Sequence, residues 1–257
     1  MSHTVIGRRR ALQTLFGAGL IACPICRALA EDHKPHWTYE GAEGPTEWGG
    51  LSADFKTCQI GLQQSPIDLT ASVTAKLGGI ESSFPTMPLT ILNNGHTIQV
   101  VCPPGGHSII SGDRFELVQF HFHHPSEHLL AGKPFDMELH FVHKSAAGKL
   151  AVLGVFIRQG AENPALVPIW AAFPAKAGDA VEVGTTIDPA ALLPKSLAYF
   201  RYSGSLTTPP CSEGVRWTVF EQPIEASREQ IQRFAALFKL DARPAQPLNN
   251  RHLMKSS

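Results

Sequence analysis

Two short runs of strictly alternating side chains constrain the fold more than any other feature. In residues 119–123, a glutamine and two histidines alternate with two phenylalanines. In residues 138–142, a glutamate, a histidine and a valine alternate with a leucine and a phenylalanine. A period of two sends successive side chains to opposite faces of a β-strand. Both runs therefore predict strands with one chemically distinctive face and one apolar face.

Further strand signals are spread along the chain. Apolar runs at 89–93 and 96–100 flank Asn94-Gly95, a pair that favours a tight hairpin turn. The clearest helix is predicted from Ser227 to about Leu240, because Ser227 and Gln230 have the spacing of a capping box. Twenty prolines and 22 glycines divide the chain into short elements, which indicates a sheet-dominated α+β fold. The other predicted strands are 116–123, 136–143, 150–158, 197–202 and 215–221.

Composition limits the partners of the protein. The 257 residues are 43% hydrophobic, which is enough for one large core and a single domain. The formal net charge is zero, so overall charge gives no reason to bind nucleic acid or an anionic membrane surface. A small substrate with little charge fits this balance better.

The first thirty residues are typical of an export signal. Arg8 and Arg9 resemble a twin-arginine motif, and the apolar stretch 11–26 that follows is short for a membrane span. Ala28 and Ala30 offer a small-residue cleavage site, which predicts a signal peptide at 1–30 and a catalytic domain at 31–257. The mature chain would have no transmembrane segment and would be periplasmic or secreted. Alternatively, residues 20–23 form a lipobox that leaves Cys23 lipidated.

Export determines the chemistry of the cysteines. Removal of the signal leaves Cys58, Cys102 and Cys211 in an oxidising compartment, where one pair can form a disulfide. Cys58 and Cys211 lie in turn-rich segments that we expect to be exposed. Cys102 ends an apolar run and is the better candidate for a buried free thiol. These patterns alone leave the pairing open.

Histidine spacing predicts a metal site. If the strands at 119–123 and 138–142 pair, then His121, His123 and His140 converge on one face. Three neutral imidazoles leave the fourth tetrahedral position free, which is typical of catalytic Zn²⁺. Gln119 and Glu138 each precede a histidine by two residues and can accept its second ring N–H. Copper or iron are alternatives, but no thiolate, thioether or facial carboxylate ligand is evident nearby.

Several motifs together resemble the α-carbonic anhydrases across nearly all of the chain after residue 31. The resemblance implies a large, twisted, mostly antiparallel sheet with zinc at the base of a conical cavity, and reversible hydration of carbon dioxide to bicarbonate. It also implies a Cys58–Cys211 disulfide, as in bacterial periplasmic members, and cis bonds at Ser65-Pro66 and Pro209-Pro210. The motifs are Gln119-Phe120-His121-Phe122-His123, Ser126-Glu127-His128, Glu138-Leu139-His140, Ser205-Leu206-Thr207-Thr208-Pro209-Pro210, Gln64-Ser65-Pro66-Ile67-Asp68, Asn93-Asn94-Gly95-His96, His36-Trp37-Thr38-Tyr39 and Arg243-Pro244-Ala245-Gln246-Pro247-Leu248.

The resemblance also implies residue roles. Thr207 would accept a hydrogen bond from the attacking hydroxide and donate its own proton to Glu127, while Thr208 would help to hold bicarbonate. His96 would carry protons between the cavity and solvent, although His107 or His124 could serve instead. The apolar wall that receives carbon dioxide would be formed by Val142, Val152, Leu206 and Trp217.

An alternative function is a non-catalytic binding protein of the same fold. Such a protein would be expected to lose a metal ligand, whereas all three histidines, Thr207, Glu127 and His96 are present. The sequence therefore favours an enzyme, a carbonate dehydratase of the lyase class, acting as a monomer or homodimer.

Overall fold

The two alternating runs form neighbouring antiparallel strands inside one large sheet. The computed structural model describes residues 35–70 and 72–257. The predicted export signal and the alternative lipid site at Cys23 lie outside the described residues. Residues His36–Ser257 form one compact unit.

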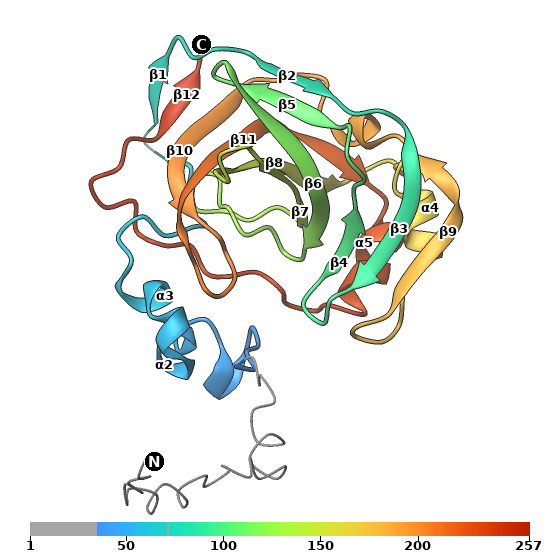
Figure 1. Cartoon of the computed structure of the whole chain (residues 1–257), viewed down its shortest axis with the longest axis horizontal. Coiled ribbons are helices and arrows are strands. Elements are labelled where there is room, and N and C mark those ends of the chain that lie inside the picture. The colour runs from blue at the N-terminus through green and yellow to red at the C-terminus, as the bar shows by residue number, and fades with distance from the viewer. Residues whose placement is uncertain (1–34, 71) are drawn as a thin grey trace, which may run out of the picture. The chain divides into compact units, whose positions relative to one another are not determined.

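The sheet has twelve strands within the described ranges, and their neighbour order is β1-β12-β10-β11-β8-β7-β6-β4-β3-β9, with β5 joining β2 to β6 (Figure 1). Only β1/β12 and β8/β11 pair in parallel among these strands. The prediction of a mostly antiparallel, sheet-dominated fold is therefore confirmed. The strands are β1 (Val73–Ala75), β2 (Ile80–Ser83), β3 (Met87–Asn93), β4 (Ile98–Val101), β5 (His107–Ile110), β6 (Asp113–His123), β7 (Met137–Lys144), β8 (Leu150–Gln159), β9 (Ala180–Ile187), β10 (Tyr199–Ser205), β11 (Glu213–Ala226) and β12 (Met254–Ser256).

The helical segments are short within the described residues. The α-helices are α2 (Trp48–Leu51), α3 (Thr57–Ile60), α4 (Val167–Ala171) and α5 (Arg228–Ala235), and the 3-10 segments are η1 (Gly41–Glu43), η2 (Ala53–Phe55) and η3 (Pro189–Leu192). Within the described residues, no helix combines the length and apolarity needed to cross a bilayer.

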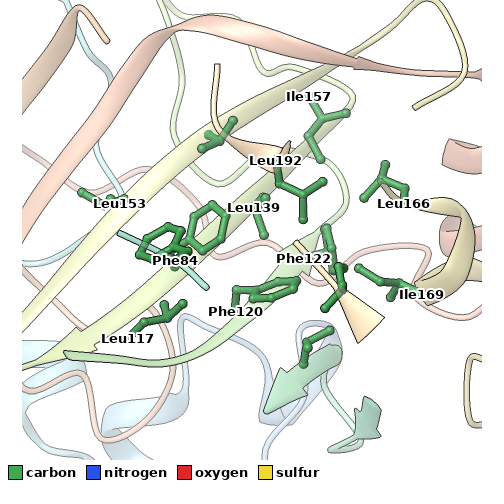
Figure 2. Close-up of a cluster of buried hydrophobic side chains, with 14 of the residues drawn as sticks. Phe84, Leu117, Phe120, Phe122, Leu139, Leu153, Ile157, Leu166, Ile169 and Leu192 are labelled. Carbon is green, nitrogen blue, oxygen red and sulfur yellow. The ribbon is translucent and has the colours of Figure 1, made fainter. Parts of the chain in front are cut away.

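The main hydrophobic core covers the apolar face of β6 and β7. Phe120 pairs with Phe141, and Phe122 pairs with Leu139, in the antiparallel register of the two strands. All four side chains are fully buried, and Figure 2 shows three of them among aliphatic neighbours from β8, η3 and α4. Burying this face fixes the register, because a slip of one residue would bring the histidines into the core.

The predicted hairpin at Asn94-Gly95 forms, but its loop is longer than the predicted tight turn. The last pair joins Asn93 to Ile98, which leaves four residues between β3 and β4. Asn94 Oδ1 accepts the amides of His96 and Thr97, each at 2.9 Å. This side chain supplies the hydrogen bonds that a two-residue turn would obtain from the ladder, so His96 lies in the loop rather than in a strand.

The predicted helix at 227–240 is shorter than expected. Ser227 caps α5 and forms both hydrogen bonds of the capping box with Gln230, but the helix ends at Ala235. Beyond the helix, Phe238 still packs against the core, whereas Leu237 and Leu240 are 40% and 38% exposed. The chain instead turns so that the Asp241 amide donates to the His124 carbonyl at 3.1 Å.

The described cysteines divide as the resemblance implied. Cys58 and Cys211 form a disulfide, whereas Cys102 is free and buried, and burial raises the pKa of its thiol to about 12. The expectation that Cys58 and Cys211 are exposed was wrong: both pack against the fully buried Trp48. The bonds at Ser65-Pro66 and Pro209-Pro210 are cis, as is His124-Pro125.

Candidate active site

Three histidines meet on the face of β6 and β7 opposite the main core. The register places His121 directly across from His140, and His123 lies two residues further along β6. One ring nitrogen from each histidine lies within 4.8 Å of the other two. His123 and His140 are buried, whereas His121 is half-buried. The cluster is therefore held by strand geometry rather than by a loop.

Each of these rings has one nitrogen already occupied by an acceptor. His121 Nδ1 lies 2.8 Å from Gln119 Oε1, and His140 Nε2 lies 2.9 Å from Glu138 Oε1. His123 Nδ1 lies 2.7 Å from the Asp241 carbonyl. These contacts select the tautomers whose remaining nitrogens carry free lone pairs. The face of the cluster is thus made of His121 Nε2, His123 Nε2 and His140 Nδ1.

Burial disfavours a proton on one ring of the cluster. Desolvation, followed by the neighbouring His123 and His140, lowers the pKa of His121 well below its usual value. Burial alone would raise the pKa of Glu138, but His128 and His140 outweigh it and hold that pKa well below its usual range. Glu138 is therefore an anion that accepts hydrogen bonds from both rings.

The predicted hydrogen bond between Thr207 and Glu127 is not formed in this structure. Glu127 is buried, and its Oε1 accepts the Arg243 amide at 2.9 Å. Its Oε2 lies 3.6 Å from His123 Nε2 and has no hydrogen-bond partner among the described residues. Thr207 is also buried, in the segment between β10 and β11. Glu127 Oε2 is the acceptor that remains available for this threonine.

The residues predicted to form the apolar wall belong to one hydrophobic cluster. Val142 and Val152 are paired across β7 and β8, and Leu206 packs against the same cluster as Trp217. The Trp217 ring lies 4.9 Å from the His140 ring, centroid to centroid. Its Nε1 donates to the Ser205 carbonyl at 2.8 Å, which fixes the indole. Apolar surface therefore adjoins one of the clustered histidines.

The structure places Thr208 near the disulfide and His96 against a tryptophan ring. Thr208 is half-buried, and its carbonyl accepts the amide of the disulfide-bonded Cys211 at 2.9 Å. His96 is half-buried and stacks on Trp37, with centroids 3.6 Å apart and planes at 8°. Desolvation and the charge of nearby His36 lower the pKa of His96. A lower pKa favours a neutral imidazole that accepts protons.

Sequence reasoning assigned no role to three residues that hold the site together. Asp241 acts through its main-chain carbonyl, which no side-chain pattern reveals. Arg243 is buried and donates to Gln64 Oε1, the Ser65 carbonyl and the Cys58 carbonyl, besides its amide contact with Glu127. His128 lies 2.7 Å from Glu138 Oε1 and 2.7 Å from the Tyr202 hydroxyl. His128 and Arg243 lie in the Ser126-Glu127-His128 and Arg243-Pro244 motifs. Their place in these motifs was the sequence signal that could have identified them.

The donor set fits a metal ion. His123 Nε2 is buried without a hydrogen-bond partner, a costly state that a cation would relieve. Three imidazole nitrogens with no thiolate or thioether in the set suit Zn²⁺, and three protein ligands leave a coordination position for reaction. A second group, His128, Glu138 and His140, also clusters, but hydrogen bonds within the group already use its atoms.

A sheet-borne cluster of three histidines, supported by hydrogen-bonded acceptors, is an arrangement typical of mononuclear metalloenzymes. Residues 43–257 match the family model for eukaryotic-type carbonic anhydrase. The chain belongs to the eukaryotic-type carbonic anhydrase family, whose members are lyases.

Relatives from several bacteria match most of the length of the chain. A carbonic anhydrase of Pectobacterium carotovorum is 45% identical over 228 residues, covering 88% of this chain and 93% of that protein. One from a Nostoc species is 42% identical over 265 residues, covering 100% of both. The α-carbonic anhydrase from Thermovibrio ammonificans, solved with the inhibitor sulfanilamide, is 48% identical and superposes with a TM-score of 0.84, over 86% of this chain and 100% of that one.

Proposed function

We propose that the protein catalyses the zinc-dependent, reversible hydration of carbon dioxide to bicarbonate and a proton. The observation that carries this proposal is the set of three facing imidazole nitrogens, each from a ring whose other nitrogen already has an acceptor. His121, His123 and His140 would hold the ion. Zn²⁺ supplies Lewis acidity that lowers the pKa of water to about 7, the value established for carbonic anhydrase.

The remaining residues of the site position the reactants. Val142, Val152, Leu206 and Trp217 offer carbon dioxide an apolar surface, which suits an uncharged substrate with little hydrogen-bonding capacity. Glu127 presents an unpartnered carboxylate oxygen, which would accept the Thr207 proton and so make the threonine oxygen an acceptor for the attacking hydroxide. Thr208 helps to hold bicarbonate, and His96 carries the released proton toward solvent.

The site of action that we propose is the periplasm or the exterior of the cell. A disulfide is typical of extracellular and periplasmic proteins. We propose that residues 1–30 direct export and that the mature enzyme begins near Glu31. Mass spectrometry of the exported protein tests this, since a lipidated N-terminus at Cys23 would give a larger and hydrophobic species.

The central experiment combines metal analysis with a hydration assay. The purified protein should contain about one Zn²⁺ per chain, and His140→Ala should lose both the ion and most of the activity. Glu138→Gln should weaken zinc binding by about 10–100-fold, because it removes the anion that orients His140.

The matched control is His124→Ala. His124 neighbours the cluster in sequence, but its Nδ1 contacts the Lys239 carbonyl at 2.9 Å and it is not one of the clustered histidines. The control should keep zinc and activity. Full activity of metal-free protein, or equal losses in His124→Ala and His140→Ala, would contradict the proposal. Inactive protein that retains stoichiometric zinc would favour the non-catalytic alternative.

A further inference from the structure

A groove that shares no residue with the histidine cluster is lined by basic side chains. It has a volume of about 690 Å³ and lies along β10 and β11, beside the segment that leads into β12. The strands β12, β10, β11 and β8 are consecutive neighbours in the sheet (Figure 1). Lys149, Arg201, Arg216, Arg251 and His252 line the groove, and its lining includes no carboxylate.

Most of these basic side chains form no ion pair. Arg216 Nη1 contacts Asp113 Oδ2 at 3.0 Å, which is the only ion pair of a groove lysine or arginine within the described residues. Arg251 donates to the main-chain carbonyls of Leu248, Ser203 and Pro247 at 2.8–3.0 Å. Those carbonyls fix the guanidinium, and the nearby Glu213 carboxylate, which forms no ion pair with it, offsets only part of its charge. The groove therefore carries a net positive charge on a partly preorganised frame.

Arg201 is the most constrained of these cations. It is only 6% exposed, its Nε donates to Thr218 Oγ1 at 3.1 Å, and its Nη1 contacts Ser111 Oγ. Its Nη2 has no hydrogen-bond partner among the described residues. Desolvation lowers the pKa of Arg201, Tyr199 offsets part of this effect, and the nearby positive charge of Arg216 lowers the pKa further. A desolvated cation next to another cation is costly unless an anion compensates it.

The side chains and the size of the groove indicate the chemistry of a ligand. Guanidinium groups present N–H donors in a fork that matches oxyanions such as phosphate. Four permanent cations and one paired carboxylate suit a ligand with more than one negative charge, and the volume suits a ligand larger than bicarbonate. We propose that this groove is a second binding site, which takes a soluble multiply charged phosphate anion.

Tripolyphosphate is the probe that tests this site, with titration calorimetry on the oxidised protein. It should bind to the wild type, and Lys149→Gln combined with Arg216→Gln should weaken binding at least about tenfold, which is about 1.4 kcal/mol. Lys149 and Arg216 are at least partly exposed, and replacing them leaves the buried Arg201 unchanged. The control pair is Lys133→Gln with Arg158→Gln, which removes the same charge from exposed positions outside the groove.

The two pairs separate a built site from general attraction to a cation. Binding that falls only in the groove pair supports the proposal. Equal weakening in both pairs, or no binding to the wild type at physiological ionic strength, would overturn it. Removing metal with a chelator should leave tripolyphosphate binding unchanged, whereas loss of binding would assign the anion to the histidine cluster. This last measurement does not depend on whether the protein hydrates carbon dioxide.

Discussion

At the scale of single residues, the site is organised by which nitrogen of each imidazole is occupied. The clustered histidines use a side-chain amide, a main-chain carbonyl and a carboxylate as three different acceptors. The carboxylate of Glu138 is shared with His128, whose other nitrogen contacts the Tyr202 hydroxyl. This buried chain of polar groups is satisfied at every step, which stabilises one orientation of His140.

His96 provides the residue-scale prediction. His96→Ala should keep zinc but lose turnover in dilute buffer, because protons would leave the site slowly. Adding a small imidazole buffer should restore turnover. The rescue should not depend on Trp37, the stacking partner of His96, because the added imidazole acts from solution.

His124→Ala and His107→Ala are the comparisons for this experiment. His107 lies on β5 opposite Glu116, and His124 contacts the Lys239 carbonyl. Undiminished turnover of His96→Ala in dilute buffer would show that protons leave by another route. A buffer-rescued loss in either comparison variant would identify that route.

At the scale of elements, β6 and β7 convert a sequence period into a site. Alternation alone is sufficient to predict both strands, and it places Gln119, His121 and His123 on one face. Their pairing register follows from the apolar face, because Phe120, Phe122 and Phe141 must all be buried. This part of the site is therefore local in sequence and predictable from it.

Other parts of the elements depend on contacts that no local pattern contains. The hairpin loop is set by the Asn94 side chain, and the end of α5 is set by where Asp241 must lie. The buried position of Cys58 depends on Trp48, which lies ten residues away in sequence and has no pattern relating it to the cysteine. Long-range packing decided these features, so propensity alone could not predict them.

His143 on β7 gives a prediction about the pH dependence of stability. Burial lowers its pKa to about 4 from the ordinary value of 6.5, while its Nδ1 contacts the Phe141 carbonyl at 2.9 Å. Between pH 6.5 and about pH 4, His143 is protonated in the unfolded chain but not in the folded chain. The contribution of His143 to the free energy of unfolding is therefore fully present above pH 6.5. It is lost as the pH falls to about 4, a change of about 3 kcal/mol in total.

Urea unfolding of metal-free protein at pH 7 and pH 4 measures this effect. His143→Phe and His143→Gln should differ in absolute stability, because only one can contact Ser108 by hydrogen bonding. Both should show a smaller loss of stability on acidification than the wild type. An unchanged difference between the two pH values in both variants would show that His143 titrates normally in the folded state.

At the scale of the whole molecule, the disulfide links the N-terminal part of the described chain to the segment that carries Thr207 and Thr208. Cys58 and Cys211 are separated by 153 residues in sequence. Arg243 reinforces the same junction, because its guanidinium donates to the Cys58 and Ser65 carbonyls. Segments from both ends of the chain thus support one side of the candidate site.

Reduction of this disulfide should lower the free energy of unfolding by about 2–4 kcal/mol, because it releases a long closed loop in the unfolded chain. Denaturant unfolding with and without reductant measures the change, with thiol titration to confirm reduction. Cys102→Ala should respond to reductant as the wild type does, since Cys102 takes no part in the disulfide. Equal stability of fully reduced and oxidised protein would contradict the prediction.

The contacts of residues 241 and 243 also set the order in which the site can be assembled. His123 depends on the Asp241 carbonyl, 118 residues later in the chain, and Glu127 depends on the Arg243 amide, 116 residues later. A growing polypeptide therefore has all three histidines long before it has the groups that orient His123 and Glu127. We therefore expect tight metal binding to be a late event in biogenesis, which follows synthesis of almost the entire chain and distinguishes a finished molecule from a fragment.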